Sequence, residues 1–320
     1  MSKTIAVIGA TGSQGGSVAR TFLKLAGWKV RAITRNTDSD KAKALASEGA
    51  EIISANVDDE SSLVKAFEGA TAIFAVTNFW EHLFTGSSPE ESGVKEAEQA
   101  KKLARAASQT SSLEHYIWST LPGAKALTNG KFPVPHFDYK AEVDDWIRSD
   151  LPELHKKTTY LVLGFYPSNL AFFPMLKPFE IPNSYGKWVQ IIPSSASALM
   201  PVSGDINVTP GLWTRQIIAK PELTKGRNVD IAPELLTFGK MLEIYGEVTG
   251  RQTAYIQSSL EDFTNVWGVG GKEIGDQFVF GEQFKDGWGS KNSVSKEELD
   301  IKDDEWPSFK QTLEGLKDHL

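Results

Sequence analysis

Three glycines at three-residue spacing follow the first apolar segment of the chain. The segment Lys3–Ile8 is short and rich in β-branched residues, which predicts a buried strand. Gly9 then permits a tight turn, Gly12 lets a phosphate approach the backbone, and Gly15 lets the following helix pack closely on the strand. That helix would direct free N–H groups and the positive end of its dipole at an anion, so the pattern predicts a site for the pyrophosphate of a dinucleotide, the alternative being a glycine-rich turn without a ligand. The polar loop residues expected at this site are Thr11, Ser13 and Gln14.

The residue after the second strand distinguishes the two common dinucleotides. An acidic residue there binds the ribose hydroxyls of NAD, whereas a basic one accommodates the 2′-phosphate of NADP. Trp28–Thr34 is expected to be this strand, and Arg35 follows it with no acid at the strand's end. Because a guanidinium stacks on adenine and pairs with phosphate, Arg35 predicts NADP(H) as the cofactor, the alternative being a solvated arginine. Asn56 and Asp58 follow the third strand, where contacts to adenine are expected, although a helix-capping turn explains them equally well.

Apolar strands alternate with helical patterns through the first half of the chain. The predicted strands cover Lys3–Ile8, Trp28–Thr34, Glu51–Ser54, Thr71–Val76, Glu114–Ser119 and Thr159–Leu163. The predicted helices cover Gln14–Ala26, Asp38–Glu48, Glu60–Phe67, Ser92–Ser108 and Phe137–Ser149. Such alternation predicts an α/β fold with a doubly wound parallel sheet, whose ligands lie outside the carboxyl ends of the strands. The residues expected to cap the second helix are Thr37 or Asp38, and those expected to be buried on the fourth are Val94, Ala97, Leu103 and Ala107.

The regularity fades after about Leu121, where Pro-, Gly- and aromatic-rich stretches replace the alternation. We expect residues 1–160 to form the cofactor-binding domain and residues 161–320 a smaller α+β substrate-binding lobe. The two parts are expected to interleave, because doubly wound folds often return strands late in the chain. The late helices are predicted at Val208–Ala219, Pro233–Glu247, Leu260–Val266 and near the C-terminus. The charged stretch Lys296–Glu305 is expected to be a solvated helix and turn.

The composition argues against several classes of protein. The 320 residues include 34 Lys and Arg against 41 Asp and Glu, a formal net charge of −7, which argues against direct binding to nucleic acid or to an anionic membrane. Cysteine is absent, which excludes disulfides, thiolate metal sites and cysteine nucleophiles. The five histidines show no metal-binding spacing, so no metal site is expected. The sequence has no apolar run long enough to span a bilayer and enters a strand with no room for a signal peptide, so we expect a cytoplasmic protein.

Five segments with these features resemble the NmrA-like family of atypical short-chain dehydrogenases/reductases. They are GATGSQGGSVAR at Gly9–Arg20, RAITRN at Arg31–Asn36, the stretch Asn56–His82, HYIWSTLPGA at His115–Ala124 and PHFDYKAEVDDWIRS at Pro135–Ser149. The resemblance implies a Rossmann-type nucleotide domain with a small C-terminal lobe that forms a cleft over the nicotinamide. The family includes NADP(H)-dependent oxidoreductases, biosynthetic enzymes that do other chemistry, and nucleotide-sensing regulators that bind protein partners. Fold alone does not choose among these activities.

The resemblance also places a candidate catalytic pair at the start of the helix near Phe137–Ser149. Standard short-chain dehydrogenases use a Tyr-x-x-x-Lys pair, and here Lys140 fits the lysine while His136 stands at the tyrosine position. Positions i and i+4 share a helix face, so both side chains are expected at the cofactor, whereas Tyr139 should point elsewhere. Lys140 is expected to bind the nicotinamide ribose, and His136 is expected either to donate a proton or to be a hydrogen-bonded histidine that begins the helix. Ser119, at the end of the fifth strand, is a candidate for binding the substrate oxygen or the nicotinamide amide, the alternative being a backbone cap.

Residues after two other strands are expected to complete the pocket. Thr77, Asn78 and Phe79 follow the fourth strand and should lie near the nicotinamide and its ribose. Phe165 and Tyr166 follow the sixth strand, where the resemblance implies closure of the nicotinamide pocket. Because an aromatic pocket suits a flat hydrophobic molecule, the expected substrate is small and apolar, of aromatic, carbonyl, imine or quinone type. The other aromatic residues considered for this lining are Phe172, Phe173, Trp188 and Trp267, each of which a plain core position also explains.

Three functions of different classes are compatible with these features. The leading one is an NADP(H)-dependent oxidoreductase that transfers a hydride to such a substrate, in a biosynthetic pathway among other settings. One alternative is a non-redox biosynthetic enzyme, such as a cyclase, that retains NADP. The other is a non-catalytic NAD(P)-sensing regulator that acts through a protein partner.

Overall fold

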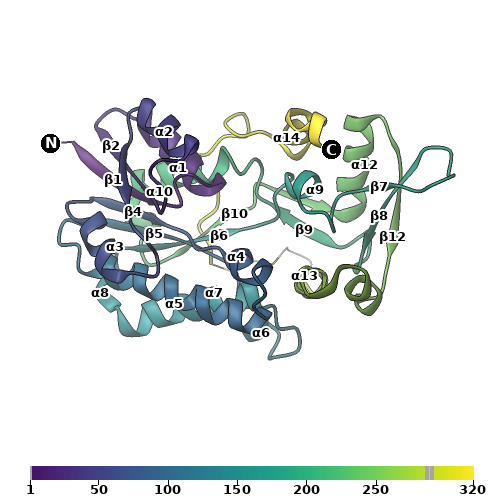
Figure 1. Cartoon of the computed structure of the whole chain (residues 1–320), viewed down its shortest axis with the longest axis horizontal. Coiled ribbons are helices and arrows are strands. Elements are labelled where there is room, and N and C mark those ends of the chain that lie inside the picture. Colours follow the sequence, from purple (N-terminus) through teal and green to yellow (C-terminus); the bar gives the residue numbers. More distant parts are fainter. Residues whose placement is uncertain (1, 285–287, 289–291) are drawn as a thin grey trace.

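A parallel β-sheet forms the centre of the larger part of the protein in the computed structural model, which describes residues 2–284, 288 and 292–320 (Figure 1). Its strands are β1 (Lys3–Ile8), β2 (Trp28–Thr34), β3 (Glu51–Ser54), β4 (Ala72–Ala75), β5 (His115–Thr120), β6 (Thr158–Leu163) and β10 (Asn228–Ile231). Within the described residues these seven strands pair in the order β10-β6-β5-β4-β1-β2-β3, and every pairing is parallel. The central strands are apolar and buried, as expected for a parallel sheet that helices cover on both faces. The predicted doubly wound α/β fold is confirmed.

Helices cover both faces of this sheet (Figure 1). Those on one face are α1 (Ser13–Leu23), α2 (Asp40–Ser47) and α10 (Thr209–Ala219), and those on the other are α3 (Glu60–Phe67), α5 (Pro89–Ser108) and α7 (Pro135–Asp150). Short helices occupy several connections: α4 (Phe79–Phe84), α6 (Ala124–Leu127), α8 (Pro152–His155), α9 (Asn169–Phe172) and α11 (Pro221–Thr224). Each face buries its own apolar core, with Phe22 and Trp213 on one side and Leu103 and Ile147 on the other. The two cores hold the sheet rigid and so fix the positions of its strand ends.

Two late segments return to the main sheet. β10 lies at its edge, where Val229 pairs with Leu161 of β6. α10 packs on α1, and the Gly211 N–H donates to Ser17 Oγ over 2.9 Å. Because both segments come from residues beyond 160, the sheet and its covering helices draw on both halves of the chain.

The remaining residues form a smaller α+β lobe, drawn on the right of Figure 1. Its elements are β7 (Phe179–Glu180), β8 (Lys187–Ile192), β9 (Leu199–Val202), β11 (Glu234–Thr237), α12 (Phe238–Thr249), β12 (Gln252–Gln257), α13 (Leu260–Gly281) and α14 (Phe309–Gly315). β8 pairs in parallel with β12 and antiparallel with β7, while β9 and β11 form a separate antiparallel pair. A core around Met200, Tyr245 and Phe278 fills the lobe. α13 is broken at Gly268, whose φ of +64° is a left-handed conformation that favours glycine.

Two predictions about the first helices differ from the structure. The N-cap of α2 is Ser39, because its hydroxyl accepts the Ala42 N–H. The predicted caps, Thr37 and Asp38, lie before that position. Val94 is 51% exposed rather than buried, because Ser92 and Gly93 form the buried face of α5 at this point, and Gly93 packs against Tyr139 of α7.

Predictions in the second half differ more. The segment Pro233–Glu247 is not one helix, because β11 occupies its start by pairing with β9 and α12 begins only afterwards. The helix predicted at Leu260–Val266 continues as the much longer α13. The stretch Lys296–Glu305 consists of turns rather than a solvated helix, and its residues Leu299 and Ile301 are buried in the core beside α10. The residues that Leu299 and Ile301 contact in this core lie far away in the sequence. The charged residues around them therefore gave no indication that they are buried.

The part of the chain that the structure describes contains neither a membrane-spanning helix nor a cluster of metal-binding side chains. No helix there combines the length and the apolar character needed to cross a bilayer. No group of three His, Asp or Glu side chains in the same residues has an arrangement that would hold a metal ion.

The contact between α1 and α10 provides a test of the fold. A Cβ at Gly211 would lie 2.2 Å from Thr21 Oγ1 and 2.5 Å from the Ser17 carbonyl oxygen. Gly211→Ala should therefore push the two helices apart and lower the free energy of unfolding by about 1–3 kcal/mol. Denaturant unfolding measures this effect. Gly315→Ala is the matched control, since the Cβ it adds would have no described atom within 4 Å apart from its chain neighbours and its own helix backbone. A Gly211→Ala protein as stable as wild type would contradict this packing.

Candidate functional site

The glycine loop holds the start of α1 against the end of β1. Gly9 has a φ of +64°, so the predicted tight turn occurs at a residue that tolerates it. A Cβ at Gly15 would lie 2.4 Å from the Gly9 carbonyl oxygen, so glycine is needed for α1 to approach so closely. Among the described residues no side chain caps α1 at Gly12, which leaves the first N–H groups of the helix available to an anion.

A cavity of about 600 Å³ runs from this loop along the ends of β1 and β2. The predicted loop residues that line it are Gly9, Thr11, Gly12, Ser13, Gln14 and Gly15. The residues after β2 that line it are Arg35, Asn36, Ser39 and Lys41. The structure therefore brings the whole predicted glycine loop and Arg35 to one cavity.

Arg35 forms a bidentate ion pair with Glu81 of α4, and both residues line this cavity. The two N–O distances are 2.5 and 3.1 Å, and the arginine side chain is 61% exposed. The hydrogen bond to Glu81 is the main cause that raises the pKa of Arg35. An exposed pair of this kind contributes little to stability, so an anion that enters the cavity can replace Glu81 at small cost. Lys41 adds a second cation to the lining of the same cavity.

Apolar residues line the cavity after β3, in place of the polar ones that were predicted. Ala55 and Val57 supply this part of the lining, rather than Asn56 and Asp58. The Asn56 side chain accepts the Asp58 N–H, and the Asp58 carboxylate accepts a hydrogen bond from Gln99 Nε2 over 2.9 Å. Both polar side chains are thus used in a turn and in its attachment to α5.

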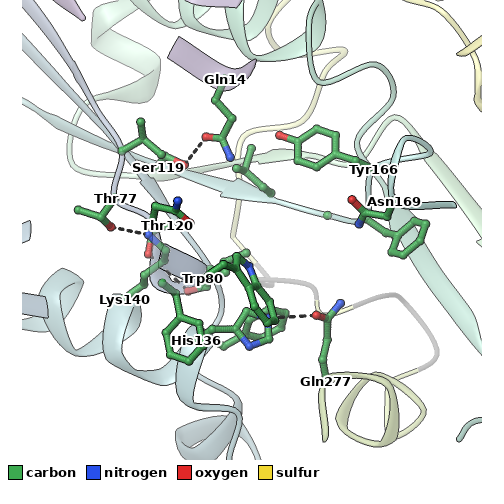
Figure 2. Close-up of a pocket in the computed structure, with 18 of the residues that line it drawn as sticks. Gln14, Thr77, Trp80, Ser119, Thr120, His136, Lys140, Tyr166, Asn169 and Gln277 are labelled. Atoms are coloured by element: carbon green, nitrogen blue, oxygen red, sulfur yellow. Dashed lines mark hydrogen bonds between the residues drawn. The ribbon is translucent and has the colours of Figure 1, made fainter. Parts of the chain in front are cut away.

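A second cavity of about 280 Å³ adjoins the first at the ends of β4, β5 and β6 (Figure 2). Gln14, Thr77 and Asn78 line both cavities and therefore mark their junction. The second cavity has largely aromatic walls, formed by Phe79, Trp80, His136, Phe137, Phe165, Tyr166, Phe173 and Trp288. Three other aromatic residues considered for this lining lie elsewhere, namely Phe172, Trp188 and Trp267. Phe172 is exposed, and Trp188 packs under Arg251.

Lys140 is held in a buried polar cluster at the junction. Its Nζ lies 2.7 Å from Thr77 Oγ1 and 2.9 Å from Glu96 Oε1. The Thr77 hydroxyl in turn donates to the same Glu96 oxygen over 2.8 Å. Lys140 is 8% exposed and Glu96 only 1%. The ammonium lies at the cavity, as predicted, but a carboxylate that no motif indicated fixes its position.

His136 joins α7 to α13 through both nitrogens of its ring. Nδ1 lies 2.6 Å from Glu273 Oε1, and Nε2 lies 3.1 Å from Gln277 Oε1. The backbone N–H of His136 donates to the same Glu273 oxygen over 2.8 Å. Figure 2 shows the ring beside Trp80, with a distance of 5.2 Å between ring centroids. In this arrangement His136 is a hydrogen-bonded histidine at a helix start, and a substrate must displace Gln277 to reach its Nε2.

Ser119, near the end of β5, and Tyr166, in the connection after β6, both line the aromatic cavity. Ser119 Oγ donates to Gln14 Oε1 over 2.8 Å. The Tyr166 hydroxyl is buried without a hydrogen-bond partner among the described residues, and Figure 2 shows it turned toward Gln14. Burial raises the pKa of this phenol, so it stays protonated and able to donate. Asn169 adds a side-chain amide to the same lining.

A buried carboxyl group lies behind the cluster, one helical turn after Lys140. Asp144 accepts hydrogen bonds from Trp118 Nε1 over 2.8 Å and from Thr120 Oγ1 over 3.0 Å. Desolvation raises the pKa of Asp144 to about 7, although these two hydrogen bonds act in the opposite direction. Asp144 thus supports the end of β5 from behind the cavity wall.

Sequence motifs did not indicate Glu96, Glu273 or Gln277. Glu96 could have been identified from sequence, because it falls within the buried stripe of α5, where a charged residue is unexpected. Glu273 and Gln277 could not have been identified from sequence, since only the packing of the smaller lobe places α13 over the cavity. Tyr139 points away from the site, as predicted, and packs on Gly93 of α5.

The sequence matches the model of the NmrA-like family over residues 1–311, and the protein therefore belongs to the NmrA-like family. It is 30% identical over 259 residues to an NmrA-like family domain-containing protein of Dictyostelium discoideum, a match that covers 80% of each chain. It is 28% identical over 291 residues to an NmrA-like family domain-containing oxidoreductase of Aspergillus campestris, covering 88% of this chain and 83% of that one. The predicted family is confirmed.

Solved structures share the fold over almost the whole chain. NmrA, a negative transcriptional regulator in complex with NAD, has a TM-score of 0.76 at 20% identity, covering 99% of this chain and 96% of that one. The NADPH-dependent quinone oxidoreductase of Escherichia coli, complexed with NADPH, has a TM-score of 0.71 at 20% identity, covering 98% and 99%. At this level of identity the likeness shows the architecture, which both a regulator and a reductase use.

The raised pKa of Asp144 predicts a pH-dependent stability. The folded protein keeps this proton up to a pKa of about 7, whereas an unfolded Asp releases it near 3.8. The group therefore stabilises the fold fully below pH 3.8, and this contribution is lost as pH rises to about 7. Asp144→Asn removes the titration, so its free energy of unfolding should rise relative to wild type by about 2–4 kcal/mol between acidic and neutral pH.

Urea unfolding at a series of pH values measures this difference. Asp145→Asn is the matched control, because Asp145 is an exposed neighbour on the same helix. Parallel stability profiles for Asp144→Asn and wild type would show that Asp144 titrates as an ordinary carboxyl group.

Proposed function

We propose that this protein is an NADP(H)-dependent oxidoreductase that transfers a hydride to a small, flat, apolar substrate of aromatic, carbonyl, imine or quinone type. The observation that carries the proposal is the pair of adjoining cavities. One runs from the glycine loop to Arg35, and the other is lined by aromatic rings and begins at Thr77. This arrangement suits a dinucleotide with its phosphates at the loop and its nicotinamide at the aromatic walls. The relatives named as oxidoreductases, and the quinone oxidoreductase with the same fold, support this function.

The residues present fit NADP(H). The uncapped N–H groups at the start of α1 suit the pyrophosphate, because they form an anion site that a side chain does not already fill. Arg35 and Lys41 suit the 2′-phosphate once Glu81 gives way. Lys140 suits the nicotinamide ribose at the junction of the cavities. When bound, the reduced nicotinamide supplies the hydride.

The protein's own side chains enclose and orient the substrate. The aromatic walls exclude water and present flat faces to a planar molecule. The Tyr166 hydroxyl and the Asn169 amide are polar groups of this lining that can hold a substrate oxygen or nitrogen. Ser119 orients Gln14, and His136 shapes the wall while Glu273 and Gln277 hold its ring. Since a Tyr-x-x-x-Lys pair is replaced here, a quinone, imine or conjugated alkene is a better acceptor than a simple ketone, because its reduction asks less of a strong proton donor.

A turnover assay tests the oxidoreductase proposal. The purified protein is incubated with NADPH and a panel of quinones, imines and aromatic aldehydes, and the absorbance of the reduced cofactor is followed. We expect multiple turnovers with at least one acceptor. NADP⁺ binding without turnover across the panel would contradict the proposal and favour a regulator. Conversion of a substrate at equal rates with NADP⁺ and NADPH would contradict it in favour of non-redox catalysis.

Arg35 tests the choice of dinucleotide. Arg35→Ala should weaken NADP(H) binding about 10- to 100-fold, because it removes a charged hydrogen bond to the 2′-phosphate, and should weaken NAD(H) binding far less, because only the stacking on adenine is lost there. Dissociation constants for both cofactors measure the effect. Arg20→Ala is the control, since Arg20 is an exposed arginine on α1 paired with Glu48. An equal loss of affinity for NADP(H) and NAD(H) would mean that Arg35 does not bind the 2′-phosphate.

A further inference from the structure

The buried pair of Lys140 and Glu96 leaves polar groups unsatisfied. Taking two charges out of water costs more free energy than their attraction returns, unless the remaining polar atoms find partners. Glu96 Oε2 has no hydrogen-bond partner in the described part of the chain, although it is buried. The Lys140 ammonium carries a third proton beyond those directed at Thr77 and Glu96, and its only other contact among the described residues is with the face of the Trp118 ring, whose centroid lies 4.9 Å from Nζ. One acceptor and one donor are thus available in the same small cluster.

The cluster lies where the two cavities meet. Thr77, Glu96 and Lys140 all line the aromatic cavity, and Thr77 also lines the cavity of the glycine loop. Figure 2 shows the hydrogen bond between Thr77 and Lys140 at the wall of the aromatic cavity. A ligand that extends from one cavity into the other passes Thr77, and Lys140 and Glu96 are the hydrogen-bonded neighbours of Thr77 on the aromatic side. In NADP(H), the group between the pyrophosphate and the nicotinamide is a ribose with two adjacent hydroxyls, each of which both donates and accepts.

The charges of the pair also favour such a ligand. A lone buried lysine would attract a phosphate, but Glu96 neutralises Lys140 and so offers an anion no net attraction. A neutral diol instead matches a charged donor beside a charged acceptor. Thr77 keeps the donor and acceptor together, because its hydroxyl bonds both Lys140 and Glu96.

We propose that Glu96 is a ribose-binding residue. Its unpartnered oxygen accepts a hydrogen bond from one hydroxyl of the nicotinamide ribose, while Lys140 donates to the other hydroxyl. This role rests on the proposed function, since it requires NADP(H) as the ligand. It makes the carboxylate, together with the lysine, a part of the cofactor site.

The test compares two ligands that share the same adenine half. NADP⁺ contains the nicotinamide ribose, whereas adenosine 2′,5′-bisphosphate lacks it. Calorimetric titration of the full chain should show that Glu96→Gln weakens NADP⁺ binding about 10- to 100-fold and changes adenosine 2′,5′-bisphosphate binding by less than about twofold. Glu98→Gln, two residues later on α5 with a side chain that is 54% exposed, should change neither.

The possible results separate this role from the proposed function. Unchanged NADP⁺ binding by Glu96→Gln would overturn the role of Glu96, and so would an equal loss of both ligands, which would indicate a damaged site. A wild-type protein that binds neither ligand would overturn NADP(H) binding itself, and the ribose site with it.

A second variant keeps the test decisive if Glu96→Gln does not fold. The double variant Glu96→Leu, Lys140→Met removes both buried charges and keeps apolar volume, an exchange that buried ion pairs tolerate. It should bind adenosine 2′,5′-bisphosphate like wild type and lose affinity for NADP⁺. Wild-type affinity for NADP⁺ in this variant would overturn the proposal.

Discussion

The parallel strands β1, β4, β5 and β6 end at one edge of the sheet, and the candidate site depends on that convergence. β1 pairs with β2 on one side and with β4 on the other, so the direction in which the chain builds the sheet reverses there. The connections on the two sides of the reversal leave in opposite directions, and a crevice opens between them. The glycine loop after β1 occupies one side of this crevice. On the other side, Ser119 lies near the end of β5, while Thr77 and Tyr166 follow β4 and β6.

The smaller lobe closes the crevice with polar as well as apolar contacts. α13 carries Glu273 and Gln277, and both bind the ring of His136 at the start of α7. This contact holds a helix of the lobe over an aromatic cavity that would otherwise face water. A buried histidine with two partners is a specific link, because a shift of α13 would leave buried polar atoms unpaired. Lys140, one turn further along α7, is fixed in the same way by Thr77 and Glu96 from two other elements.

The central strands of the main sheet could be predicted from sequence because burial on both faces leaves nearly continuous apolar runs, as in Lys3–Ile8 and Ala72–Ala75. The glycine loop was also predictable, since steric limits at Gly9 and Gly15 leave few other residues possible. The cavity-lining side chains after β3 were not predictable, because a difference of one residue in where the strand ends exchanges Asn56 and Asp58 for Ala55 and Val57. The partners of His136 lie 137 and 141 residues away, and no local pattern reports a contact made by the packing of a separate lobe.

A crystal structure of the protein with NADP⁺ is the most direct measurement of how the two cavities are used. It should show the pyrophosphate at the start of α1, the nicotinamide ribose against Thr77, Glu96 and Lys140, and the nicotinamide ring between the aromatic walls. An ordered NADP⁺ whose nicotinamide half lies outside the aromatic cavity would contradict the assignment of that cavity to hydride transfer.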